Sequence, residues 1–127
     1  MSYLIDTQAF IWYATGDNQL SQRAKNIIES SDVRFVSIAS VWEMAIKVSI
    51  GKLNFKVPFK DFILEQVAIG KYELLNINTP HIFQLTNLSH HHKDPFDRIL
   101  IAQAISENIP IVSIDVAFDN YGVQRIW

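Results

Sequence analysis

The sequence predicts an α/β fold, a three-layer sandwich in which helices flank a mostly parallel central sheet. Short apolar runs alternate along the chain with longer helical segments, which is the pattern of parallel strands joined by helical crossovers. Residues 111–114 are apolar except for Ser113 and do not alternate regularly, as expected for a strand buried on both faces. The chain has no internal repeat and no Pro/Gly/Ser-rich linker, so we expect a single domain over residues 1–127.

Start and stop signals place the elements of the first half. Gly16 follows an apolar segment and suits the left-handed position after a helix end. Ser21 is a good N-cap for the segment after it, and Gly51 stops a long helix. The expected elements are strands at residues 4–5 and 34–37 and helices over residues 7–15, 21–30 and 38–50.

Proline and cap residues place the elements of the second half. Pro58 suits the first position of a helix, and Asp94 followed by Pro95 is the usual pair of N-cap and first helical residue. Thr79 is the expected cap of a short helix. The expected elements are helices over residues 58–69, 79–88 and 94–108 and strands over residues 72–77, 111–114 and 123–126.

Composition narrows the class of protein. Hydrophobic residues make up 49% and charged residues 19%, which fits a chain that buries a core. The absence of cysteine excludes disulfides, thiolate metal sites and a cysteine nucleophile. The net charge of −2 argues against a general polyanion binder, so nucleic acid would need a local basic patch. No basic leader and no apolar run near the ~20 residues of a membrane span occurs, so we expect a cytoplasmic protein without membrane contact.

Four acidic residues border apolar runs and therefore the expected core: Asp6, Glu43, Asp97 and Asp115. Asp6 and Asp115 follow strands, and the carboxyl ends of parallel strands meet at the edge of the sheet where ligands bind. Two carboxylates about 4 Å apart repel by roughly 4 kcal/mol at an effective dielectric near 20. A divalent cation removes that repulsion, so we expect the four acids to converge on Mg²⁺ or Mn²⁺.

The helix that contains Glu43 has one narrow polar stripe. Ser37, Ser40, Glu43 and Lys47 recur at steps of three, three and four, while nearly all other positions are apolar. A helix that is apolar around most of its circumference is expected to be buried. Its stripe then faces either solvent, with Glu43 and Lys47 as an i,i+4 ion pair, or an internal polar cleft.

The segment before the last helix carries two acids with different explanations. Helix capping alone explains Asp94. Asp97 lies in the first turn, where the helix dipole favours an anion by up to ~1 kcal/mol. Because an apolar run follows it directly, its side chain should also border the core or the cleft.

Three consecutive histidines precede this segment. His90, His91 and His92 lack the paired spacing of a helical zinc site, so we expect an exposed loop with at most a secondary role in phosphate contact or proton transfer. Lys47 and Arg98 are candidates for holding a phosphate backbone beside the cleft, although each is also an ordinary surface residue.

Several segments together resemble a PIN domain. They are Leu-Ile-Asp-Thr at residues 4–7, Ser-Ile-Ala-Ser-Val-Trp-Glu-Met-Ala-Ile-Lys at 37–47, Gly-Lys-Leu at 51–53, His-His-Lys-Asp-Pro-Phe-Asp-Arg-Ile-Leu-Ile-Ala-Gln-Ala at 91–104 and Ser-Ile-Asp at 113–115. The resemblance covers nearly the whole chain and is closest to the small VapC-like toxins of bacterial toxin–antitoxin pairs.

The resemblance implies a Mg²⁺- or Mn²⁺-dependent ribonuclease that hydrolyses RNA phosphodiester bonds, made with a cognate antitoxin and expected to be a homodimer. Carried over by position, the catalytic and metal-binding residues are Asp6, Glu43, Asp97 and Asp115. The supporting candidates are Asp94, Ser37 and Ser40, and the candidates for RNA contact are Lys47 and Arg98.

Other functions fit parts of this pattern. A phosphatase of the haloacid-dehalogenase type expects a second aspartate two residues after the first, where this chain has Gln8. A receiver domain expects paired acids after the first strand, where Asp6 stands alone. A non-catalytic module that holds a basic partner in the acidic cleft is the alternative that remains, and a Mg²⁺-dependent RNA cleavage assay would separate it from a nuclease.

Overall fold

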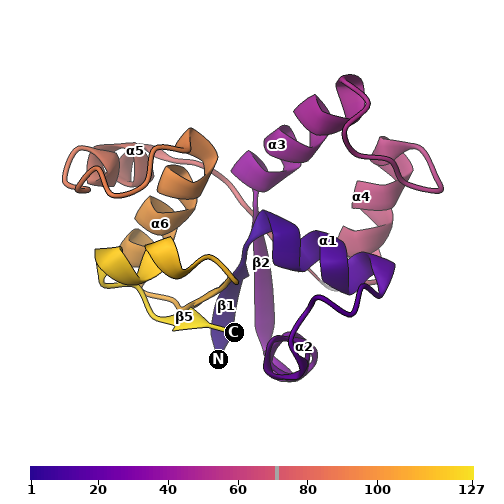
Figure 1. Ribbon diagram of the computed structural model, residues 1–127, viewed down its shortest axis with the longest axis horizontal. Coiled ribbons are helices and arrows are strands. Elements are labelled where there is room, and N and C mark those ends of the chain that lie inside the picture. The colour runs from indigo at the N-terminus through magenta and orange to yellow at the C-terminus, as the bar shows by residue number, and fades with distance from the viewer. Residues whose placement is uncertain (71) are drawn as a thin grey trace.

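The computed structural model describes residues 1–70 and 72–127 (Figure 1). Its described strands form one sheet in the order β3-β2-β1-β4-β5, and every neighbouring pair is parallel. This confirms the predicted α/β class with a parallel sheet. The strands are β1 (Ser2–Ile5), β2 (Val33–Ser37), β3 (Tyr72–Leu75), β4 (Ile111–Val112) and β5 (Arg125–Ile126).

Most helix ends lie where the sequence predicts them. The Ser21 hydroxyl caps α2 by accepting a hydrogen bond from the Ala24 amide, and Gly16 ends α1 with a φ of 68°. Among the described residues, none of the helices combines the length and apolar character needed to cross a bilayer. The helices are α1 (Thr7–Thr15), α2 (Gln22–Ser30), α3 (Ile38–Ser49), α4 (Phe59–Ala68), α5 (Thr79–Leu85), α6 (Pro95–Glu107) and the 3₁₀ helix η1 (Val116–Tyr121).

The helices cover both faces of the sheet, as Figure 1 shows for α1 and α4 on one side and α5 and α6 on the other. Along β1 the side chains alternate between two cores. Ile5 packs with Phe10 of α1 in the first core, whereas Leu4 packs with Leu100 of α6 in the second. Each core is closed by helices, so the strands are buried on both faces and the fold has three layers.

Two helix starts differ from the prediction by one residue. Pro58 precedes α4 with an extended backbone (ψ 144°) instead of forming its first residue. Asn78, and not Thr79, caps α5, because its side chain accepts from the His81 amide while the His81 ring accepts from the Asn78 amide. Such reciprocal caps are usually found with Glu or Gln in the third position. Because a histidine stands in the third position here, the sequence did not predict this cap.

The prediction that the whole of α3 is buried was wrong. Met44 is fully buried, but Trp42, Ile46 and Ile50 have exposed fractions of 60%, 39% and 59%. The helix begins directly after β2 and extends beyond the end of that strand (Figure 1). Only part of its circumference can therefore pack against the rest of the protein.

Topology brings several element ends to one edge of the sheet. The strand that follows β1 in the chain, β2, lies on one side of it, whereas β4 on its other side is followed by β5 farther out. The connections that leave the neighbouring strands β1 and β4 therefore run in opposite directions. In open parallel sheets, ligands bind outside the carboxyl ends of the strands at such a point. Because α6 leads back to the start of β4, the first turn of α6 also lies at this carboxyl edge.

Candidate functional site

A cavity of about 260 Å³ lies at the carboxyl edge of the sheet. It is lined by five acids from four separate segments of the chain, together with Lys47. All four acids that were expected to converge are among them, and Asp94 is the fifth. The lining residues are Asp6, Thr7, Gln8, Glu43, Lys47, Asp94, Asp97, Ile114 and Asp115.

Asp6 is fixed by the junction between β1 and α1. Its amide donates to the Val112 carbonyl (3.1 Å), and its carboxylate accepts from the Ala9 amide (2.8 Å) as the N-cap of α1. The residue is only 6% exposed. Burial raises its pKa from 3.8 to about 6, hydrogen bonds from Ser113 and Ala9 oppose the rise, and the nearby charges of Asp115 and Glu43 add to it.

Asp115 lies at the junction between β4 and η1, with Ser113 and Ile114 between it and the end of the strand. Its amide donates to the Ser113 hydroxyl (3.0 Å), and its Oδ1 accepts from the Ala117 amide (3.0 Å), which caps η1. Asp6 and Asp115 thus both cap the helix that follows a neighbouring strand. Capping fixes one oxygen of each carboxylate and leaves further acceptor capacity on both.

The polar stripe of α3 faces the protein interior at its start and the cavity further along. Ser37 caps the helix by accepting from the Ala39 amide, and the buried Thr7 hydroxyl donates to the Ser40 hydroxyl (2.7 Å). Ser37 and Ser40 are fully buried, so this part of the stripe does not face solvent. The predicted Glu43–Lys47 ion pair also forms, with Nζ and Oε2 3.3 Å apart.

Asp94 and Asp97 lie together at the start of α6. As predicted, Asp94 caps this helix, since its Oδ1 accepts from the amides of Phe96 (2.8 Å) and Asp97 (3.2 Å). Burial raises the pKa of Asp97 from 3.8 to about 7, and the neighbouring Asp94 adds to the rise. His92 lowers that pKa, whereas Glu43 contributes a smaller increase. A cation in the cavity would relieve this repulsion.

His92 was not expected at this site. Its Nε2 lies 2.9 Å from Oδ2 of Asp115 and 3.0 Å from Oδ2 of Asp97. Within residues 1–70 and 72–127, these three side chains form the one group whose potential metal-ligating atoms all lie within 4.8 Å of one another. His90 and His91 are exposed as predicted, but His92 is only 16% exposed. The one sequence feature that could have placed His92 near the acids is its position two residues before Asp94, the cap of α6.

The two basic candidates differ in their surroundings. Lys47 is 42% exposed, lines the cavity and pairs with Glu43. Arg98 donates to the main-chain carbonyls of Ser89 (2.8 Å) and His92 (3.2 Å), so its guanidinium holds the loop before α6. The role of either residue in RNA contact stays a prediction.

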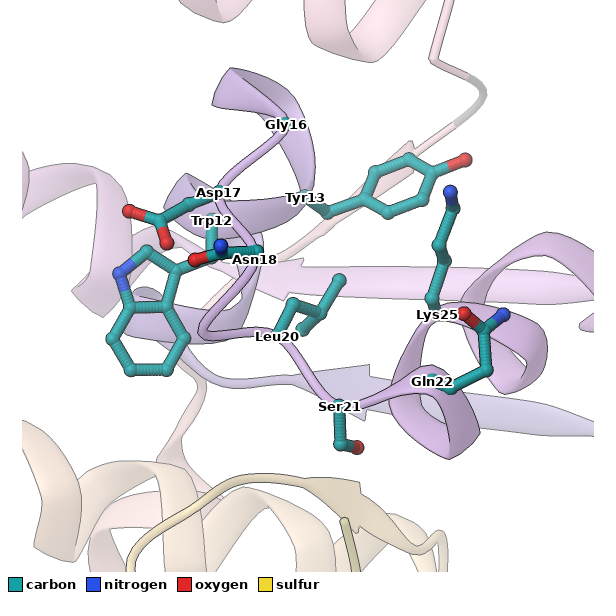
Figure 2. A pocket seen from close by; sticks show the side chains of 9 residues that line it. All are labelled: Trp12, Tyr13, Gly16, Asp17, Asn18, Leu20, Ser21, Gln22 and Lys25. Carbon is teal, nitrogen blue, oxygen red and sulfur yellow. The ribbon is translucent and has the colours of Figure 1, made fainter.

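A larger cavity, of about 710 Å³, lies between the end of α1 and the start of α2 (Figure 2). Trp12 and Tyr13 are partly exposed and line it. Asp17 is the single acid among its nine lining residues, and it accepts a hydrogen bond from the Gln19 amide. This cavity therefore lacks the acid cluster that lines the smaller one.

The chain resembles known proteins in both sequence and fold. A model of the PIN domain family matches residues 3–124. Among solved structures, VapBC2 from Rickettsia felis bound to a DNA fragment from their promoter has a similar chain (TM-score 0.71, 13% identity, 99% of this chain and 98% of that one).

Two further structures are similar over nearly the whole chain. FitAcB from Neisseria gonorrhoeae gives a TM-score of 0.70 at 15% identity, covering 98% of this chain and 96% of that one. VapBC-1 from nontypeable Haemophilus influenzae gives 0.72 at 16% identity, covering 99% and 97%. No curated protein sequence matches significantly. At these identities the structures establish a shared fold.

Proposed function

The chain belongs to the PIN domain family, and on that premise we propose that it is a metal-dependent endoribonuclease that hydrolyses RNA phosphodiester bonds. One observation carries the proposal: Asp6, Glu43, Asp97 and Asp115, from four separate segments, line one cavity at the carboxyl edge of the sheet. An acid that only caps a helix or forms an ion pair does not need three other acids beside it. Four converging carboxylates are best explained by a ligand that carries positive charge.

The donor set fits Mg²⁺ or Mn²⁺. Carboxylate oxygens are hard ligands of the kind these ions prefer, and the cavity is large enough to leave room for water and a substrate phosphate. Burial is the main cause of the raised pKa values of Asp6 and Asp97, and the charges of the neighbouring acids add to the rise, so a bound cation would favour the charged forms of both. When bound, the ion would lower the pKa of a coordinated water and neutralise charge on the scissile phosphodiester.

The residues around the cavity have three proposed roles: to bind the ion, to support its ligands and to contact the substrate phosphate. Asp6 and Asp115 would hold the ion from the carboxyl edge of the sheet, where their capping bonds fix one oxygen of each carboxylate. Asp97 and Glu43 complete the set from α6 and α3, and Asp94 supports it by capping α6. Lys47 stands beside Glu43 at the cavity, where its ammonium group can contact the phosphate on either side of the cleaved bond.

Partners follow from the resemblance to VapC-like toxins. We propose that a cognate antitoxin binds the protein and blocks the acidic cavity, and that the protein forms a homodimer. The exposed Trp42 and Ile46 of α3, with Ile50 directly after it, provide an apolar surface for a protein contact. Both partnerships are tested by co-purification and by the oligomeric state of the isolated protein.

RNA cleavage tests the proposal. The purified protein should cut single-stranded or loop RNA with Mg²⁺ or Mn²⁺ and lose that activity in EDTA. Asp6→Asn and Asp115→Asn should each abolish cleavage while circular dichroism shows a native fold. Asp17→Asn, in the cavity between α1 and α2, is the matched control and should cleave normally. Full activity in either site variant would remove that residue from the proposed centre.

A non-catalytic binding module is the second candidate, because an acidic cavity could also hold a basic partner. No RNA cleavage by a folded protein that binds Mg²⁺ would favour this candidate, whereas cleavage that persists in EDTA would contradict the metal dependence. In that case the same acid variants should weaken binding of the basic partner.

A further inference from the structure

The His92 ring contacts both acids that flank the cavity on its α6 and β4 sides. Its Nε2 approaches Oδ2 of Asp115 (2.9 Å) and Oδ2 of Asp97 (3.0 Å), and so connects two segments that are otherwise separate. We propose that His92 is a positioning residue that holds these two carboxylates in place for the metal ion. The proposal rests on the proposed function and adds a residue that the acid set alone does not include.

The ring is held in one orientation by groups on several elements. The His92 amide donates to the Tyr121 hydroxyl (2.6 Å), and the His92 carbonyl accepts from Arg98 (3.2 Å). The Phe118 ring lies beside the imidazole at a centroid distance of 5.9 Å. A side chain whose main chain is fixed on both sides and whose ring is packed can aim Nε2 at a defined point. The two neighbouring histidines of the loop are exposed.

Hydrogen bonding assigns the tautomer. The Asp94 amide points at Nδ1 (3.3 Å), which must therefore accept. In a neutral imidazole the proton is then on Nε2. Nε2–H can donate to the carboxylates of Asp97 and Asp115, whereas metal ligation through Nε2 would require the proton to sit on Nδ1, facing another donor. A ligating histidine normally donates its second N–H to an acceptor.

The position of the ring agrees with this role. Asp97 and Asp115 line the acidic cavity, but His92 is not among its lining residues in the described part of the chain. The ring therefore contacts the two carboxylates from outside the cavity. Each carboxylate keeps acceptor capacity toward the cavity, because an ionised carboxylate offers about four lone-pair sites. His92 can thus orient both groups without occupying the place of the ion.

Mn²⁺ titration of the purified protein, followed by calorimetry and by water-proton relaxation, tests the proposal without any activity measurement. His92→Ala should lower Mn²⁺ affinity about 10- to 100-fold, the usual effect of removing a partner that orients a metal ligand. His92→Gln should recover most of the affinity, because its amide N–H can reach the former Nε2 position. His90→Ala removes an exposed histidine from the same loop and should bind Mn²⁺ like the wild type.

Imidazole ¹⁵N NMR separates positioning from ligation. The proposal predicts that His92 carries its proton on Nε2 both without metal and with saturating Mg²⁺. A shift of the proton to Nδ1 on adding Mg²⁺, with loss of affinity in both His92→Ala and His92→Gln, would show direct ligation and overturn the proposal. Tighter Mn²⁺ binding by His92→Ala would also overturn it, because the ring would then compete with the ion.

The outcomes also separate this role from the proposed function. Wild-type affinity in a folded His92→Ala variant, together with metal-dependent RNA cleavage by the wild type, would overturn only the role of His92. A wild-type protein that binds neither Mn²⁺ nor Mg²⁺ would overturn both. If His92→Ala does not fold, the His92→Gln titration and the wild-type tautomer decide the question.

Discussion

Replacing Asp97 by asparagine should stabilise the metal-free protein at neutral and alkaline pH. Burial, with the neighbouring Asp94, raises the pKa of Asp97 from 3.8 to about 7. Because the folded-state pKa is above the unfolded value, protonated Asp97 favours the folded state. That contribution is complete below about pH 4 and is lost as the pH rises through about 7. Asparagine resembles the protonated carboxyl group and should avoid the loss.

The magnitude follows from the shift. A rise of about three pKa units corresponds to about 4 kcal/mol at ~1.4 kcal/mol per unit. The neutral amide gives up the attraction between the Asp97 carboxylate and His92, which lie 3.0 Å apart. We therefore expect the free energy of unfolding at pH 8 to rise by roughly 1 to 4 kcal/mol, and the difference to vanish near pH 4.

Urea denaturation in EDTA at both pH values measures this difference, and thermal melts with Mg²⁺ measure the link to metal. Wild-type stability should rise by about 2.7 kcal/mol when free Mg²⁺ reaches 100 times its dissociation constant. The Asp97→Asn variant should lose most of that rise. Asp94→Asn is the control and should keep most of it, since asparagine also caps a helix. An Asp97→Asn protein that is less stable without metal at pH 8, and keeps the full Mg²⁺ effect, would show that Asp97 is a structural acid.

Two other outcomes are expected. Mg²⁺ affinity should increase as the pH rises from about 5.5 to 8. Asp6 and Asp97, with pKa values of about 6 and about 7, must lose their protons when the ion binds. Calorimetry that gives the same Mg²⁺ affinity at both pH values would contradict the assignment of these acids as metal ligands. The adjacent reading frame should encode a short protein that co-purifies with this one and reverses the growth arrest it causes, and failure of co-expression to do either would refute the toxin assignment while leaving the nuclease open.

The convergence of the acids could be predicted because topology alone requires it. Asp6 directly follows β1 and Asp115 lies shortly after β4, so the order of elements along the chain brings both to the carboxyl edge of the sheet. The Asp94-Pro95 pair marks the start of α6 through local capping chemistry, and Asp97 follows within one turn. Strand ends and helix caps are set by residues close together in the sequence, so both can be predicted from the sequence alone.

The features that were missed depend on contacts between distant segments. His92 reaches the acids because Arg98 and Tyr121 bind its main chain and fix the conformation of the loop. The hydrophobic periodicity of the sequence does not predict a loop conformation. The exposed side of α3, including Trp42, depends on how far the helix extends beyond the sheet. The sequence pattern of an apolar helix is the same whether its outer face packs against its own chain or against a partner protein.

Anomalous diffraction from crystals grown with Mn²⁺ tests the central claim most directly, because it locates the ion independently of activity. We predict a peak in the acidic cavity within about 2.5 Å of carboxylate oxygens of Asp6 and Asp115, with a carboxylate of Asp97 or Glu43 close enough to bind directly or through water. The peak should disappear in Asp6→Asn crystals. A peak at another place, or an ordered acidic cavity without one at saturating Mn²⁺, would contradict the claim that these acids form a metal centre.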